Sequence, residues 1–204
     1  NKLDFNLNVD DSHGKDKYLL AGLLTQSQGN YVLNLRSDSL MLNYDKWTIS
    51  PNNSLTITKN NILADNFTLQ KGNEQLSLQT ESQLLNVRFT NFSLGTISGF
   101  MKSDTVLADG SMNGVITFRN ILQQPVFTSD LAINNLSFRG DTLGNATVKV
   151  DNTSGDRYST NVAITGRGND ASLTGYFAPL GSNDIALNLD LNIKTLQLNT
   201  LEGA

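Results

Sequence analysis

The sequence predicts an all-β protein built from antiparallel strands. The clearest observation is a run of five apolar residues at every second position: Ile185, Leu187, Leu189, Leu191 and Ile193. A period of two is typical of a strand with one apolar and one polar face, whereas a helix would spread these side chains around its axis. At Lys194 the phase slips, which predicts a bulge or a second strand there.

The same alternation recurs along the chain and predicts the other strands. They are expected around residues 3–9, 18–24, 31–35, 40–42, 47–49, 55–57, 62–64, 67–69, 76–78, 87–89, 112–118, 126–133, 136–138, 146–150, 162–164 and 173–177. Turn residues separate them, as in residues 10–16 and 51–53, and Gly29-Asn30 is a hairpin signal because both residues tolerate positive φ. Strands every ~8–12 residues are typical of an antiparallel meander, sandwich or barrel.

Composition reduces the number of these architectures, and of the protein functions, that fit the sequence. The chain has 204 residues, a net charge of −4 and 38% apolar residues, and it has no Cys. The charge argues against a nucleic-acid partner, and the missing Cys excludes disulfides and thiolate chemistry. The low apolar content with persistent alternation favours a folded-over sheet that stays open as an apolar groove over a closed sheet with a filled interior.

One segment departs from the alternation. Leu94, Ile97 and Met101 are spaced by three and four residues, which predicts a short amphipathic helix over residues 93–102 with Ser93 as its N-cap. Two glycines inside the segment weaken this helix by roughly 1 kcal/mol each relative to Ala.

Both ends of the chain lie close to strand patterns, and no signal peptide or apolar run near the ~20 residues of a membrane span is visible. We therefore expect one elongated β domain, residues 1–204, cut from a longer chain. Residues 91–99 align with residues 195–203, with matching Thr and Gly positions. This alignment predicts repeat units of about 1–103 and 104–204, and chance similarity among leucine-rich strands is the alternative.

The sequence offers little for catalysis. His13, the single histidine, lies in a polar turn without a set of metal ligands around it. The segment Gly166-Arg167-Gly168 lacks the third Gly of a phosphate loop, and we assign no glycan to the Asn-x-Ser/Thr triplets. We expect no enzyme, no catalytic residue, no metal and no cofactor. One enzymatic alternative stays open: a β-sandwich enzyme whose catalytic carboxylates are distant in sequence and meet only in the folded structure.

The apolar phase supplies the candidate binding residues. Aromatic side chains on this phase serve either core packing or the lining of a site for an acyl chain. The candidates for lining an apolar groove are Val148, Val150, Val162, Ile164, Ile185, Leu187, Leu189, Leu191 and Ile193.

Three segments carry a family resemblance. Residues 92–101, 109–118 and 124–131 have a strand, a short apolar helix, a Gly-x-x-x-Gly strand and a strand opened by Pro125. This order resembles the repeat unit of the AsmA-like superfamily, and within it the TamB-like family of translocation and assembly module subunits. Residues 141–148 and 171–176 resemble the family's following strands. The resemblance is best over residues 84–203.

The resemblance implies a long sheet folded like a taco shell, with an apolar groove that lies in the periplasm of a Gram-negative bacterium. It implies an anchor in the inner membrane and a partner of the outer-membrane assembly barrel type, both contacted through other parts of the full chain. The implied function is phospholipid transfer between the membranes, or assistance in assembling outer-membrane proteins. Expected partners are phospholipid acyl chains and, through open sheet edges, a second copy.

A hypothesis of another class stands beside this one. The chain is then a structural or adhesive β-repeat domain that binds protein or glycan through its polar face.

Overall fold

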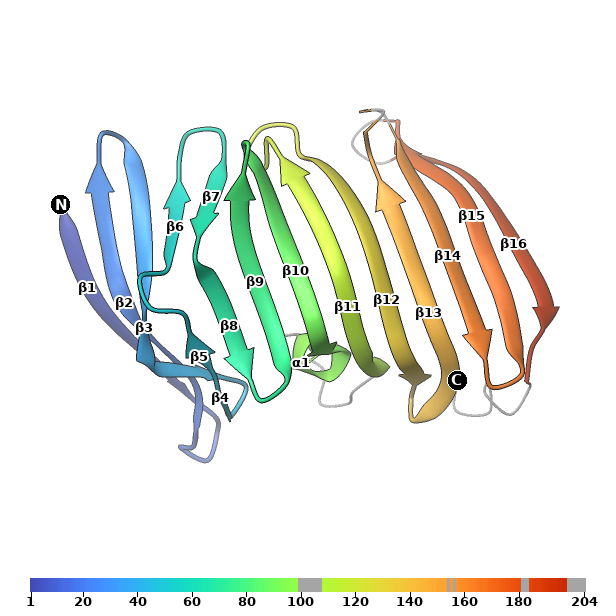
Figure 1. Ribbon diagram of the computed structural model, residues 1–204, viewed down its shortest axis with the longest axis horizontal. Coiled ribbons are helices and arrows are strands. Elements are labelled where there is room, and N and C mark those ends of the chain that lie inside the picture. The colour runs from blue at the N-terminus through green and yellow to red at the C-terminus, as the bar shows by residue number, and fades with distance from the viewer. Residues whose placement is uncertain (99–107, 154, 156, 181–183, 198–204) are drawn as a thin grey trace. The chain divides into compact units, whose positions relative to one another are not determined.

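The computed structural model describes residues 1–98, 108–153, 155, 157–180 and 184–197. These residues form antiparallel strands and one short helix, so the all-β prediction is confirmed (Figure 1). The elements are β1 (Lys2–Asp10), β2 (Asp16–Ser27), β3 (Asn30–Leu42), β4 (Asp45–Lys46), β5 (Thr48–Ile49), β6 (Ser54–Ile57), β7 (Ile62–Asp65), β8 (Phe67–Lys71), β9 (Glu74–Glu81), β10 (Leu84–Ser93), α1 (Leu94–Ser98), β11 (Ala108–Arg119), β12 (Val126–Phe138), β13 (Asp141–Asp151), β14 (Tyr158–Gly166), β15 (Asn169–Pro179) and β16 (Ile185–Thr195).

The strands belong to two sheets in which neighbours in space are mostly neighbours in sequence. The first sheet has six strands in the order β1-β2-β3-β6-β7, with β4 paired to β3. The second has ten, running from β16 back to β8 and then to β5. The described chain divides into two compact units, residues 1–90 with 117–125 and residues 91–116 with 126–204.

In the first unit, cross-strand register gathers apolar side chains on one face of the first sheet. Leu3 of β1 lies opposite Leu24 of β2, and Leu24 lies opposite Leu33 of β3. Residues directly opposite each other share a face, so these leucines form a row. The most buried hydrophobic residues of this unit are Ala21, Leu40, Trp47, Ile49, Ala64, Phe67 and Leu85.

The predicted β2–β3 hairpin is present, but its positive-φ residues differ from the expectation. Its two central residues, Gln28 and Gly29, both have positive φ (51° and 79°), and Ser27 pairs with Asn30. This is the backbone pattern of a type I′ turn. The predicted role of Asn30 was therefore wrong, since Asn30 already belongs to β3 and the left-handed position before the glycine is filled by Gln28.

The predicted helix is present where the structure describes it. It spans Leu94–Ser98, and the N–H of Gly95 donates to Ser93 Oγ at 3.1 Å, which is the expected N-cap. Residues 99–102 of the prediction lie outside the described residues, as do residues 198–203 of the aligned repeat. The phase slip at Lys194 is a bulge, because Ile193 pairs with Ala171 while Thr195 pairs with Asp170.

An Asn residue in the left-handed region recurs three times: between β7 and β8, in β10, and at a bulge in β12. Asn66, Asn91 and Asn135 have φ of 48°, 47° and 52°. The N–H of each donates to a side-chain amide oxygen of a neighbouring strand at 2.9–3.0 Å: Gln79 Oε1, Asn113 Oδ1 and Asn145 Oδ1. Asn tolerates this conformation better than most residues. Three of the Asn-x-Ser/Thr triplets therefore mark left-handed backbone positions, with a large apolar residue directly after each Asn.

Glycines in the strands of the second unit allow close approach of neighbouring backbones. Their φ values lie between 125° and 133°, and an added Cβ would overlap a carbonyl oxygen of the adjacent strand. These pairs are Gly114 with Asp130, Gly144 with Thr165 and Gly175 with Asn188. A side chain at these positions would push the two strands apart.

We expect Gly175→Ala to lower the free energy of unfolding by about 1–3 kcal/mol more than Gly140→Ala. Both glycines have positive φ, so both variants incur backbone strain, but a Cβ at Gly140 meets nothing within 4 Å. Urea denaturation of the two variants measures the difference. Equal losses would mean that the overlap with the Asn188 carbonyl is relieved without cost.

We expect Asn113→Ala to lower stability by about 0.5–1.5 kcal/mol, because the Asn91 N–H loses its acceptor. Asn113→Asp keeps an oxygen at that place and should retain most of the stability at pH 7. Denaturation midpoints of the two variants provide the measurement. Identical losses would contradict the role of the amide oxygen as the cap of the bulge.

Candidate functional site

The second unit carries a two-sided sheet in strands β12 to β16. One row of directly opposed residues runs across all five strands: Leu131, Val148, Val162, Leu173 and Leu191. The adjacent row is Ile133, Ala146, Ile164, Ala171 and Ile193. Because opposed residues share a face and alternate residues return to it, these rows form one continuous surface, called here the apolar face.

All nine candidate groove residues lie on the apolar face. Val148 and Val150 come from β13, and Val162 and Ile164 come from β14; all four are half-buried. The other five come from β16 and are far more open: Ile185 is 64%, Leu187 67%, Leu189 43%, Leu191 62% and Ile193 49% exposed. The register thus brings the nine residues together on one side of the sheet, with β15 between β14 and β16.

The candidate set lacks the residues that join its two halves. Ala171, Leu173 and Phe177 of β15 lie opposite Ile193, Leu191 and Leu187, respectively. These residues also alternate in the sequence, but Gly175 interrupts the apolar series. The signal was therefore present, and pairing β15 with its sequence neighbours as a meander identifies Leu173 and Phe177 as part of the face.

Aromatic rings form one row near an end of the apolar face. Tyr158 and Phe177 are directly opposed on β14 and β15, and their rings stack at 4.6 Å between centroids with an interplanar angle of 8°. Phe127 of β12 lies 6.0 Å from Tyr158 in a tilted arrangement. Leu187 continues this row on β16. Ile185 lies beyond this row, opposite Pro179, so the aromatic rings lie within the apolar face.

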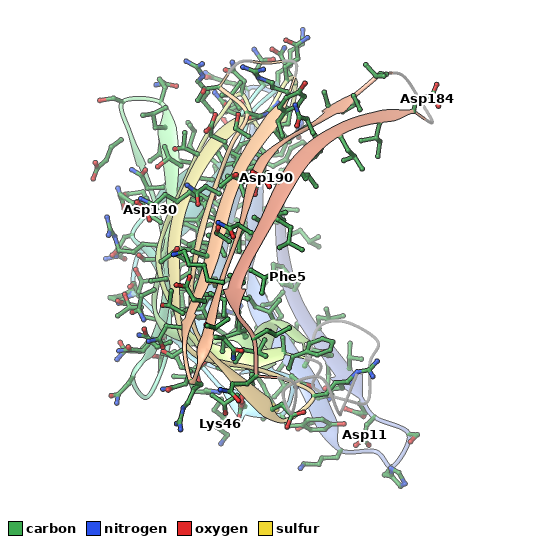
Figure 2. All side chains as sticks on the ribbon, turned by 90° about the vertical axis from the view of Figure 1, so that its right-hand side faces the viewer. Phe5, Asp11, Lys46, Asp130, Asp184 and Asp190 are labelled. Atoms are coloured by element: carbon green, nitrogen blue, oxygen red, sulfur yellow. The ribbon has the colours of Figure 1, made fainter. Side chains whose placement is uncertain are left out.

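The opposite side of the same strands is polar. Its central row consists of Asp130, Lys149, Asn161, Thr174 and Asp190. Lys149 Nζ lies 3.0 Å from Asp130 Oδ2, and both side chains are exposed. Figure 2 shows Asp130 projecting away from the strands on this side. Exposed pairs of this kind contribute little to stability, so the polar face serves solubility first.

The apolar face carries no charged side chain among its described rows, from Phe127 on β12 to Ile193 on β16. Contiguous exposed apolar surface of this kind marks an interaction site for apolar ligands or partners. The chemistry available is the exclusion of water from a hydrocarbon surface.

The acidic turn near the N-terminus is structural. Asp11 accepts hydrogen bonds from the N–H of His13 at 2.8 Å, the N–H of Lys15 at 3.0 Å and the hydroxyl of Tyr44 at 3.0 Å. The N–H of Lys15, followed by that of His13, lowers the pKa of the Asp11 carboxyl. Among the described residues, no three His, Cys, Asp or Glu side chains are grouped to hold a metal ion.

The first unit has a smaller apolar opening at the β1 edge. A surface pocket of about 300 Å³ is lined by Leu3, Leu24 and Tyr31 together with polar residues of β1 and β2. Leu3 is 58% exposed, so this opening is shallow and wide. The described helix is too short to cross a bilayer.

Comparisons of the chain with models of protein families, with curated proteins and with solved structures each found no match. The resemblance to the AsmA-like superfamily remains a prediction from the motifs in the sequence.

Proposed function

We propose that the apolar face of β12–β16 binds the hydrocarbon chains of phospholipids. In this proposal the chain is a segment of a TamB-like or AsmA-like protein that shields acyl chains from water during transfer between membranes. The observation that carries it is the largely apolar side of these strands, which ends at β16 in five large side chains that are 43% to 67% exposed. The row of Val150 and Leu189 on this side also contains Ser129, Thr160 and Gly175. Exposed leucines in single positions are ordinary, but five on one face are not.

The energetics favour a sliding ligand over a fixed one. Each methylene moved from water to an apolar surface gains about 0.8 kcal/mol, and the rows repeat across five strands with similar side chains. A hydrocarbon chain displaced along the Leu131 row or the Ile133 row therefore meets an apolar side chain on each strand. The absence of charges on the described rows leaves the polar headgroup in solvent.

The location and the larger partners of this proposal come from the family resemblance. They are the periplasm of a Gram-negative bacterium, an inner-membrane anchor and an outer-membrane assembly barrel contacted by other parts of a full-length chain. Assistance in assembling outer-membrane proteins would use the same apolar face for an unfolded strand.

The test compares charges placed on the two sides of one strand. We expect Leu187→Asp with Leu191→Asp to weaken binding of a pyrene-labelled phosphatidylcholine to delipidated protein by at least about tenfold, because two charges must then be desolvated or avoided. Fluorescence titration at low protein concentration measures the affinity. The side chains are exposed, so the fold should persist, and circular dichroism verifies this.

The matched control is Asn188→Asp with Asn192→Asp, which adds the same charge to the polar side of β16. This control should bind the labelled lipid like the parent protein. Absence of lipid binding by the parent would overturn the proposal and favour a structural or adhesive domain. Equal weakening by both double variants would show that net charge, not the apolar face, governs binding.

A further inference from the structure

Among the described strands, the outer backbone edge of β16 has no partner. β16 ends the strand order of its sheet, and its only pairing among the described strands is with β15 (Figure 1). An edge strand presents a row of backbone N–H and C=O groups that a further strand can pair with. This edge is therefore a second binding feature, distinct from the apolar side chains.

β16 lacks most of the features that block edge pairing. It is 11 residues long, contains no Pro, and its single bulge lies at Lys194 near its end. Proteins usually protect an edge of this length with prolines, central lysines or bulges. From Ile185 to Ile193 the pairing with β15 is regular, so no bulge interrupts the outer edge of this segment, where another strand could pair.

The sequence of β16 is complementary to itself in one antiparallel register. With Leu189 opposite Leu189 of a second copy, Leu187 faces Leu191 and Ile185 faces Ile193. On the polar side, Asn188 faces Asp190 and Ala186 faces Asn192. At the two ends, Asp184 faces Lys194, so the pair gains two contacts between opposite charges. Asp184 lies where β16 begins, and Asp190 lies further along the strand (Figure 2).

Neighbouring registers lose this complementarity. A shift by two residues in one direction places Asp190 opposite Asp190, and like charges directly opposite are unfavourable. The shift in the other direction leaves Asp190 opposite Ala186 and moves Lys194 away from Asp184. A shift by one residue places apolar side chains opposite polar ones on both faces. Lys194 already contacts Asp170 Oδ2 at 3.2 Å, and its ammonium has two further protons to donate.

We propose that β16 pairs with β16 of a second copy in antiparallel orientation, with Leu189 at the two-fold axis. The second copy is favoured over an unrelated strand by the end-to-end charge match and by the single register that satisfies it. Two-fold pairing places both apolar faces on the same side of the joined sheet. The pairing uses backbone groups of the edge and so does not depend on lipid binding.

Single cysteines test the register, because the chain has no cysteine of its own. Opposed residues in an antiparallel pair have Cα atoms about 4.5–5.5 Å apart, which suits a disulfide. We expect Leu189→Cys to form a disulfide-linked dimer under mild oxidation at least about tenfold more than Leu187→Cys, whose own copy lies about 13 Å further along the strand. Non-reducing gel electrophoresis measures the yield.

A mixture provides the control for reactivity. Leu187→Cys and Leu191→Cys should each cross-link poorly alone and efficiently when mixed, because these positions face each other across the pair. Equal cross-linking of all three single variants would overturn the register. Analytical ultracentrifugation of the parent protein at about 100 μM, 100 times the concentration used for the lipid titration, tests the dimer itself. A monomer under these conditions would overturn the dimer, whether or not the protein binds lipid.

Discussion

Cross-strand register is the constraint on which the second unit depends. Each pairing from β12 to β16 keeps the alternating apolar residues of one strand opposite those of the next, and the slip at Lys194 comes only after Ile193. A shift of one residue in any pairing would move a strand's apolar side chains to the polar side. The apolar face is therefore a property of all four pairings together, and no single strand creates it.

Local devices protect that register by satisfying or sparing the backbone. The left-handed Asn135 lies at a bulge in β12, and amide oxygens from neighbouring strands accept the N–H groups of Asn91 and Asn135. Gly144 and Gly175 let the backbone approach its neighbour where a Cβ would collide with a carbonyl oxygen. The side-chain amide of buried Asn169 also satisfies a backbone group, because its Nδ2 donates a hydrogen bond to the carbonyl of Leu143 at 2.8 Å. The polar and glycine positions that interrupt the alternation thus maintain it elsewhere.

The sequence was informative wherever one physical rule acts alone. Alternation located the strands and the bulge at Lys194, and a serine before an apolar 3–4 spacing located the cap of α1. Alternation failed where two effects compete. At Gly175 the close approach of the β16 backbone excludes a side chain, so the apolar series of β15 is interrupted there. Which residue of a turn adopts positive φ also escaped, because Gln28 is held there by the pairing of Ser27 with Asn30. The nine groove candidates were placed on one side by register, which a single sequence leaves implicit.

The exposed apolar side chains of β16 represent surface whose burial by a ligand or partner would release free energy. Fully burying a Leu or Ile side chain is worth about 1.5–3 kcal/mol, and five such residues on β16 keep 43% to 67% of their surface in water. A hydrocarbon ligand would cover their side chains, whereas a paired strand would satisfy the backbone edge and cover only their flanks. The two occupants use perpendicular surfaces of one strand, so a paired sheet would still offer its apolar face, now twice as long. Edge pairing therefore extends the surface for an acyl chain and does not compete for it.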